Sequence, residues 1–219
     1  MTLTLYAHPL SSYCQKALIG LYELDLPFEF RFLGPDDPAT FGELLRLWPI
    51  GKFPLLVDDG IALPEASLIL EHLDERHAPG RLVPADPAER MEMRLIDRVI
   101  DNYVATPQQK TIADRMRPED KRDPHGVDEA HALLEKSYTW LDQRLAGRAW
   151  AAGERFTLAD CGAAPMLFYA DWVHPFGDRF PTLSAYLERL RSRPAVQRAF
   201  DEAKPYRHMV LGGIPAHVV

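Results

Sequence analysis

Two hydroxyls and one thiol crowd together near the start of this chain. The segment "HPLSSYCQKA" contains Ser11, Ser12 and Cys14, and it follows a short apolar run, "LTLYA". The residues after it, "LIGLYEL", have helical spacing, so these side chains are predicted to lie between the end of a strand and the start of a helix. Free N–H groups and the helix dipole favour negative charge there. The segment therefore suits a bound anion such as a thiolate, although serine is also an ordinary N-cap.

Two further segments combine polar residues with the ends of predicted elements. In "GKFPLL", a cis peptide bond between Phe53 and Pro54 would turn the Phe53 backbone outward, where it could pair with an extended peptide. In "LPEASLIL", Glu65 and Ser67 fall in the first turn of a predicted helix. Free N–H groups in that turn can hold a ligand carboxylate. Taken singly, each segment is also explained by capping or by strand geometry.

The elements that must position these segments alternate between strand and helix in the first part of the chain. Strands are predicted at 3–7, 28–33, 54–57 and 61–63, and helices at 13–25, 40–48 and 65–77. The order βαβαββα predicts an α/β unit with one parallel strand pair and an antiparallel hairpin at its edge.

The strand pattern ends at a proline-rich stretch, "HAPGRLVPADPAE". Helical spacing follows at Met91, Leu95, Val99, Ile100 and Tyr103, and Pro107 is predicted to kink or end that helix. Further helices are predicted at 127–147, 156–172, 181–193 and 194–203. We therefore predict an α/β domain at 1–79, a linker at 80–88 and an all-α domain at 89–219.

Composition excludes several classes of protein. The 219 residues carry a net charge of −7, which argues against a nucleic-acid binder, and no apolar run approaches the length of a membrane span. The start lacks the basic and apolar pattern of a signal peptide. Two cysteines make neither a disulfide framework nor a zinc site, so we expect no metal and a reducing, cytoplasmic setting.

Taken together and in order, four segments resemble the soluble glutathione S-transferase family, in particular its serine-type (theta- or zeta-like) members. These segments are "YAHPLSSYCQKA", "PIGKFPLL", "LPEASLILEHLDE" and "FTLADCGAAP". The resemblance covers residues 3 to about 203 and implies a thioredoxin-like domain followed by an all-helical domain. In the last segment, Thr157 as N-cap and Asp160 three residues later read as a structural capping box.

The resemblance places the catalytic hydroxyl on Ser11, with Ser12 as the fallback. Tyr6 is a secondary candidate, because some family members use a tyrosine near the end of the first strand. Cys14 lies one helical turn further along and is interpreted mainly as a packed, inert thiol.

The same resemblance implies a glutathione-binding set. Its members are Lys52, Phe53, Pro54, Glu65, Ala66 and Ser67. Lys52 should meet the glycyl carboxylate, Phe53 the cysteinyl backbone and Glu65 the γ-glutamyl end. Ala66 stands where the family usually has serine, so it keeps the N–H but lacks the hydroxyl. We expect weaker glutathione binding, which Ser67 could offset only if the turn shifts.

The implied activity is transfer of glutathione, as co-substrate, to a small hydrophobic electrophile, with detoxification as the typical role. The implied substrate pocket lies between the domains, with Tyr103, Gln108 and Arg115 as candidate lining residues. Family members are usually homodimers. Two alternatives remain: thiol–disulfide exchange or peroxide reduction through Cys14, and a non-catalytic binding protein, which the missing hydroxyl at Ala66 favours. The tail, residues 205–219, either folds over the pocket or is disordered.

Overall fold

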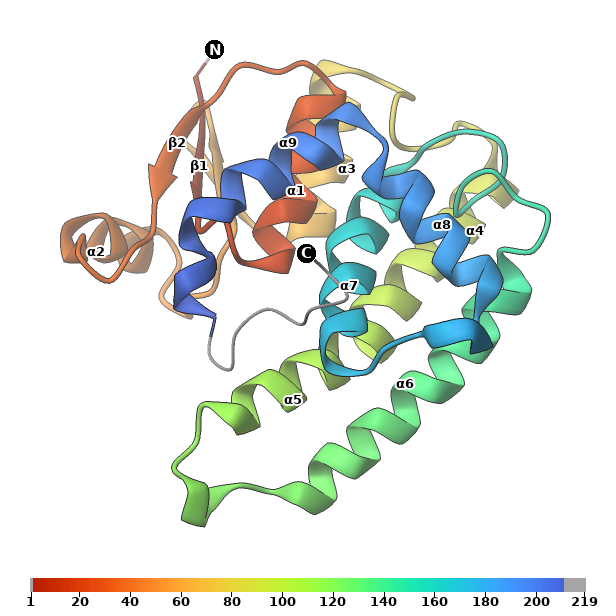
Figure 1. The fold of residues 1–219 in the computed structure, drawn as a ribbon. Coiled ribbons are helices and arrows are strands. Elements are labelled where there is room, and N and C mark those ends of the chain that lie inside the picture. Colours follow the sequence, from red (N-terminus) through yellow and green to blue (C-terminus); the bar gives the residue numbers. More distant parts are fainter. Residues whose placement is uncertain (1, 211–219) are drawn as a thin grey trace.

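A computed structural model describes residues 2–210 of the chain. The first elements are β1 (Leu3–Ala7), α1 (Ser12–Glu23), β2 (Glu29–Phe32), α2 (Pro38–Leu47), β3 (Leu55–Asp58), β4 (Ile61–Pro64) and α3 (Ala66–His77). They form a four-stranded sheet in the order β2-β1-β3-β4 (Figure 1). β1 runs parallel to β2 and antiparallel to β3, and β3 and β4 form a hairpin. The predicted βαβαββα unit is confirmed.

The alternation of β1 sorts its side chains onto two faces of the sheet. Leu5 belongs to the core that includes residues of α1 and α3, whereas Tyr6 packs in a separate cluster with Leu44 of α2. Gly20 lets α1 and α3 approach closely, because a Cβ there would lie 2.0 Å from Cδ2 of Leu70. The start of α1, which carries the serines, is therefore anchored on the face opposite α2.

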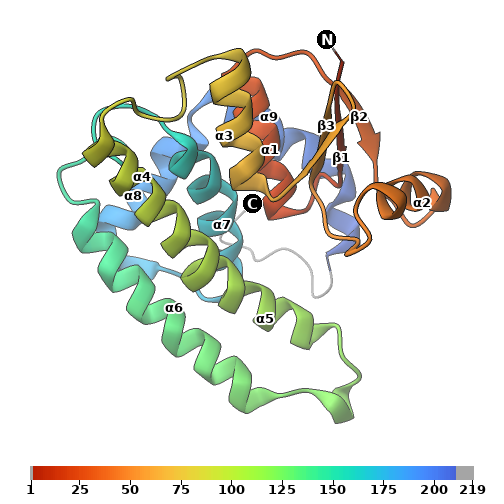
Figure 2. The same cartoon turned by 180° about the vertical axis from the view of Figure 1, so that it is seen from behind.

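The rest of the described chain is helical. It contains α4 (Pro87–Val99), a π-helical stretch η1 (Ile100–Ala105), α5 (Thr106–Arg115), η2 (Glu119–Lys121), α6 (Pro124–Arg144), α7 (Leu158–Val173), η3 (Gly177–Arg179), α8 (Pro181–Arg191), α9 (Pro194–Ala203) and η4 (Lys204–Met209). α5 and α6 form a long antiparallel pair that extends away from the sheet (Figures 1 and 2). No helix in residues 2–210 combines the length and the apolar character that a membrane crossing requires.

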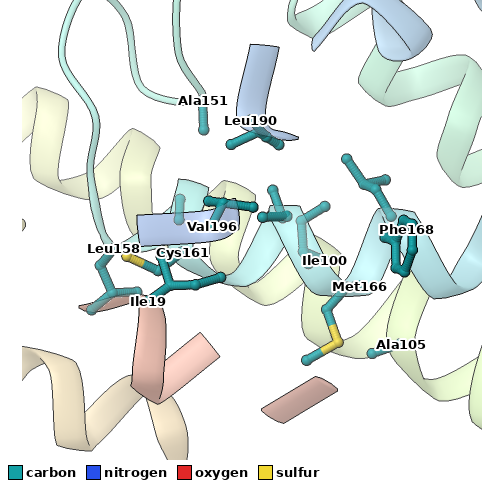
Figure 3. Close-up of a cluster of buried hydrophobic side chains, with 14 of the residues drawn as sticks. Ile19, Ile100, Ala105, Ala151, Leu158, Cys161, Met166, Phe168, Leu190 and Val196 are labelled. Carbon is teal, nitrogen blue, oxygen red and sulfur yellow. The ribbon is translucent and has the colours of Figure 1, made fainter. Parts of the chain in front are cut away.

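Helix α7 is the centre of the core. It packs against α1, α4 and η1, and nearly every residue in it is buried. Figure 3 shows side chains of α7 meeting apolar residues from several other elements; those labelled are Ile19, Ile100, Ala105, Ala151, Leu158, Cys161, Met166, Phe168, Leu190 and Val196. The same core therefore joins the helices of the sheet unit to the helical region.

The capping box predicted at the start of α7 is present. The carboxylate of Asp160 accepts hydrogen bonds from the Thr157 N–H and hydroxyl, each at 2.8 Å. Its other oxygen accepts from the Ala151 N–H at 2.8 Å and the Tyr186 hydroxyl at 2.6 Å. Asp160 is fully buried, and these bonds give it the structural role that the sequence predicted.

Pro107 does not end its helix. The chain stays helical from α4 through α5, with η1 just before the proline. Proline lacks an N–H and clashes with the carbonyl four residues earlier, here that of Tyr103. That carbonyl accepts a hydrogen bond from the Ser137 hydroxyl at 2.8 Å. The prediction that Pro107 ends the helix is wrong, and a kink there stays a prediction; a local π-helical turn directly precedes α5, and it contains Asp101, which contacts Lys16.

The apolar residues at helical spacing divide between core and surface: Ile100 is fully buried and Val99 packs against the core, whereas the other three are exposed. Met91 is 67% exposed, Leu95 42% and Tyr103 51%. Met93 and Ile96 lie in the core instead. Helical spacing established that a helix forms, but packing against α7 decided which side is buried.

Candidate functional site

The junction between β1 and α1 has the capped geometry expected of a helix start. Ser11 is the N-cap, with φ −75° and ψ 122°, and its Oγ accepts from the Cys14 N–H at 3.4 Å. The Gln15 N–H bonds to the Ser11 carbonyl at 2.8 Å. No acceptor among the described residues takes the N–H groups of Ser12 and Tyr13. Two free donors and a hydroxyl proton are thus gathered at the positive end of α1.

Two cavities meet at Ser11. The first, of about 460 Å³, is named the polar cavity; its lining is Ser11, Tyr13, Trp48, Gly51, Lys52, Phe53, Pro54, Glu65, Ala66, Arg98, Asp101, Asn102 and Gln109. The second, of about 260 Å³, is named the apolar cavity; its lining is Leu10, Ser11, Ser12, Gln108, Gln109, Ile112, Arg115, Met116, Tyr169, Trp172, Val173, Met209 and Val210. Ser11 and Gln109 line both.

Both charge signs are present in the polar cavity. Neither Lys52 nor Glu65 has an ion-pair partner among residues 2–210, and both are exposed. The Phe53–Pro54 peptide bond is cis, as the sequence suggested. Glu65 precedes α3 with φ 72°, in the left-handed region that side chains rarely adopt, and its side chain makes no cap bond. Such backbone conformations cluster at ligand sites.

A buried ion network beneath the polar cavity was missed at the sequence level. The Lys16 ammonium is fully buried and lies 2.6 Å from Asp97 Oδ1 and 3.0 Å from both oxygens of Asp101. Arg98, which lines the cavity, reaches Asp97 at 2.8 Å and Asp101 at 2.7 Å. Burial opposes ionisation of Asp97, but Lys16 and Arg98 hold its pKa below the usual value. The network is neutral overall and ties α1 to α4 and η1.

This network has a sequence signal, although a weak one. Lys16 interrupts an otherwise apolar helix, and Asp97 and Asp101 recur at a spacing of four residues in the next helical segment. A charged residue on an apolar face predicts a buried partner. The identity of that partner depends on tertiary packing: a Cβ at Gly162 of α7 would lie only 3.1 Å from Cε of Lys16, so glycine leaves room for the lysine.

The segment at the start of α3 divides between the cavity and this network. Ala66 lines the polar cavity and is 4% exposed. The Ser67 hydroxyl instead bonds the Lys16 ammonium at 2.8 Å and Asp97 at 2.8 Å. Ser67 does not line the polar cavity. Because its hydroxyl is bonded within the ion network, it does not replace the hydroxyl that Ala66 lacks.

Two alternative nucleophile-activating groups lie outside both cavities. The Tyr6 hydroxyl donates to Glu43 on the α2 side of the sheet at 3.2 Å, and burial together with Glu43 raises the pKa of Tyr6. Cys14 is fully buried, and burial raises the pKa of its thiol to about 12. A thiol in that state carries almost no thiolate near neutral pH, in agreement with the interpretation of Cys14 as an inert core residue.

The candidate pocket residues do not all line the apolar cavity. Ser12, Gln108 and Arg115 line the apolar cavity. Tyr103 does not; its side chain is half-exposed, and its carbonyl accepts a hydrogen bond from the Ser137 hydroxyl. Tyr169 and Trp172 of α7 also line the cavity, although both are largely buried. Of the tail, Met209 and Val210 contribute to the wall, and residues 211–219 lie outside the described part.

One group of side chains has the composition of a metal site. Asp58, His72 and His77 place one ligand atom each within 4.8 Å of one another, on the hairpin and α3. Both imidazoles contact Oδ2 of Asp58, at 2.8 and 3.0 Å, and the Arg76 guanidinium reaches the same oxygen at 3.2 Å. Because the Arg76 cation already contacts this oxygen, we interpret the cluster as a set of polar contacts that hold the β3–β4 turn against α3.

Comparison with known proteins places the chain in a family. Residues 5–81 match the family model of the glutathione S-transferase N-terminal domain, and residues 124–189 match that of the C-terminal domain. The chain is 27% identical to glutathione S-transferase GstB of Escherichia coli K12, over 90% of this chain and 96% of that one. It is 30% identical to FtsZ-localized protein A of Caulobacter vibrioides, over 92% of each chain.

A solved structure shows the same arrangement. The glutathione S-transferase of Methylobacterium radiotolerans, in complex with glutathione sulfonate, is 29% identical, with a TM-score of 0.80 over 91% of this chain and 94% of that chain. The same family is indicated by both family models, by the relatives and by the thioredoxin-like sheet with its helical region. This chain belongs to the glutathione S-transferase family.

Proposed function

We propose that the protein is an active glutathione S-transferase in which glutathione occupies the polar cavity and an apolar electrophile the other cavity. The observation that carries the proposal is the position of Ser11, which lines both cavities at the start of α1. A thiol held at that point faces free helix N–H groups on one side and the second substrate on the other. The related structure with glutathione sulfonate supports the choice of ligand.

The charges of the polar cavity fit glutathione, which carries two carboxylates and one ammonium at neutral pH. We assign the glycyl carboxylate to Lys52 and the γ-glutamyl ammonium to Glu65. We assign the γ-glutamyl carboxylate to the N-terminus of α3, where the Ala66 N–H lies. Phe53, beside the cis Pro54, is assigned to the cysteinyl backbone.

The chemistry needs a thiolate. A free thiol has a pKa of about 8.5, and only its anion attacks. Lowering that pKa by about two units takes roughly 2.7 kcal/mol of preference for the anion. A hydrogen bond from the Ser11 hydroxyl together with the α1 dipole can supply an amount of this order. The thiolate then forms a C–S bond with the electrophilic carbon, and the electron pair of the broken bond leaves with the leaving group.

Calorimetry of glutathione binding tests the ligand assignment. We expect the wild type to bind and Glu65→Gln to bind about tenfold more weakly, because a hydrogen bond between charged groups is worth about 1.5–3 kcal/mol. Glu71→Gln is the matched control, since Glu71 lies on the same helix but pairs with Arg94. Ala66→Ser should strengthen binding by restoring the hydroxyl. A wild type that ignores millimolar glutathione would overturn the proposal and favour a non-catalytic binding protein.

We also propose a homodimer. Leu68 of α3 is 55% exposed, and Met91 and Leu95 of α4 are exposed as well. Glu71 and Arg94 bridge the two helices at 2.9 Å, so these side chains share one surface. An apolar surface of this kind suits a second copy of the chain. Light scattering of Leu95→Glu should show a monomer where the wild type is a dimer; a wild-type monomer would refute this.

A reducing, cytoplasmic setting fits the proposed activity. Cys14 and Cys161 are both buried and unpaired. Glutathione keeps thiols reduced in such a compartment. Fractionation of cells that express the protein, with detection by antibody, tests this placement.

A further inference from the structure

Arg115 occupies an unusual position in the apolar cavity. It is the one charged side chain in that lining, and it is exposed at the end of α5. Its guanidinium has no hydrogen bond or ion pair to any residue of the described chain. The adjacent acid does not neutralise it, because Asp114 accepts from the Asp123 N–H at 2.7 Å and lies 3.6 Å from Arg117.

Among residues 2–210, the rest of the wall offers no negative charge. Leu10, Ile112 and Val173 are apolar. Tyr169 is the remaining group that could ionise, and burial raises its pKa to about 12, so it stays neutral. Within the described part of the chain, Arg115 is therefore a cation without a counter-ion that lines a largely apolar cavity.

We propose that the second substrate is an organic anion, with a carboxylate held by Arg115 and a single-ring apolar body against the cavity wall. The inference rests on the proposed transferase function. A cavity of about 260 Å³ lies just below the usual range of ligand pockets, which favours a single-ring body over a large polycyclic one. Arginine forms bidentate hydrogen bonds with carboxylates, because its guanidinium is a planar fork that matches their geometry. Arg115 is then the residue that determines specificity for the anion.

A matched pair of aryl chlorides tests this assignment. 4-Chloro-3-nitrobenzoate is anionic, and 4-chloro-3-nitrobenzamide has the same shape without the charge. With each, the glutathione thiolate adds to the ring carbon that bears chlorine, the C–S bond forms and the C–Cl bond breaks, and chloride leaves with its electron pair. Intrinsic reactivity differs between the two probes, so each variant is compared with the wild type on the same probe.

We expect Arg115→Gln to lower kcat/KM for the benzoate about tenfold, mainly through KM, and to change that for the benzamide less than about twofold. Arg115→Lys should recover part of the loss because it keeps the charge. Arg117→Gln is the control, because Arg117 is an exposed arginine two residues away that does not line the cavity. Equal losses on both probes, or no loss on either, would overturn the inference; equal losses would mean that Arg115 acts on the thiolate.

A binding measurement separates this inference from the transferase activity. The glutathione conjugates of the two probes are titrated into the wild type and Arg115→Gln. Preference for the carboxylate conjugate in the wild type, lost in the variant, supports the inference even if no turnover occurs. Turnover of the benzamide with no preference for the anionic conjugate leaves the proposed function standing and removes this inference.

Discussion

Removal of the Ser11 hydroxyl should raise the pKa of enzyme-bound glutathione. In Ser11→Ala the N-cap oxygen and its proton disappear, while the N–H groups of Ser12 and Tyr13 remain. The hydroxyl accepts from the Cys14 N–H, so its own proton is free to donate to a sulfur anion. The variant therefore loses one of the groups that stabilise the thiolate and keeps the helix dipole.

The size of the effect follows from that one bond. A hydrogen bond to a charged group contributes about 1.5–3 kcal/mol, and one pKa unit corresponds to about 1.36 kcal/mol. The thiol pKa should thus rise by about one to two units. Loss of an N-cap costs about 0.5–2 kcal/mol of stability. The lower end applies to Ser11, because its 3.4 Å bond to Cys14 is longer than a normal hydrogen bond, so the variant should still fold.

The assay is the ultraviolet absorbance of the thiolate in the glutathione complex as a function of pH. The rate of conjugation at a pH below both pKa values should fall about 10- to 100-fold, in proportion to the thiolate fraction. Ser12→Ala is the matched control: Ser12 is the next residue, and it lines the apolar cavity only. It should shift the thiol pKa much less than Ser11→Ala.

Two results would refute this reasoning. An unchanged thiol pKa in Ser11→Ala would mean that the helix start alone holds the anion. A larger shift in Ser12→Ala would move the catalytic role to Ser12, the fallback assignment. Loss of glutathione binding in Ser11→Ala, with stability retained, would instead give Ser11 a role in binding.

Three further outcomes concern the buried polar groups. Lys16→Met should lower the free energy of unfolding by about 3–5 kcal/mol in urea titrations, because two buried carboxylates lose their shared cation, whereas Lys110→Met, which breaks an exposed pair, should cost about 0–1 kcal/mol. Equal losses would refute the buried network. Burial would raise the pKa of Asp58, but its two imidazole partners and a guanidinium hold it below the usual value, so its stabilising contribution is present above about pH 4 and lost as pH falls through the lowered pKa. The unfolding free energies of wild type and Asp58→Asn should therefore converge in acid, and a difference that grows there would contradict the pairing. Burial raises the thiol pKa of both Cys14 and Cys161, so a disulfide reagent at neutral pH should modify neither until the protein unfolds; rapid labelling of Cys14 would revive thiol–disulfide exchange.

Much of the fold could be predicted because it depends on neighbours along the chain. Alternation at residues 3–7 and helical spacing after Ser11 each involve a few consecutive positions. Caps are local in the same way: Asp37 bonds the Thr40 N–H at 3.0 Å and starts α2 two residues before the predicted helix. The domain boundaries proposed from the sequence, 1–79, 80–88 and 89–219, stay a prediction.

The sequence by itself determined the order of the strands and helices in the sheet unit, a serine-rich helix start after the first strand and the family, because each rests on residue types at short, fixed spacings. The tertiary structure alone decided which groups meet across long separations. Lys16 meets Asp97 across the core, Arg115 has no ion-pair partner among residues 2–210, and Tyr6 is turned toward α2 and away from both cavities. Such choices depend on how helices and sheet pack against one another, and that packing is a property of the whole core.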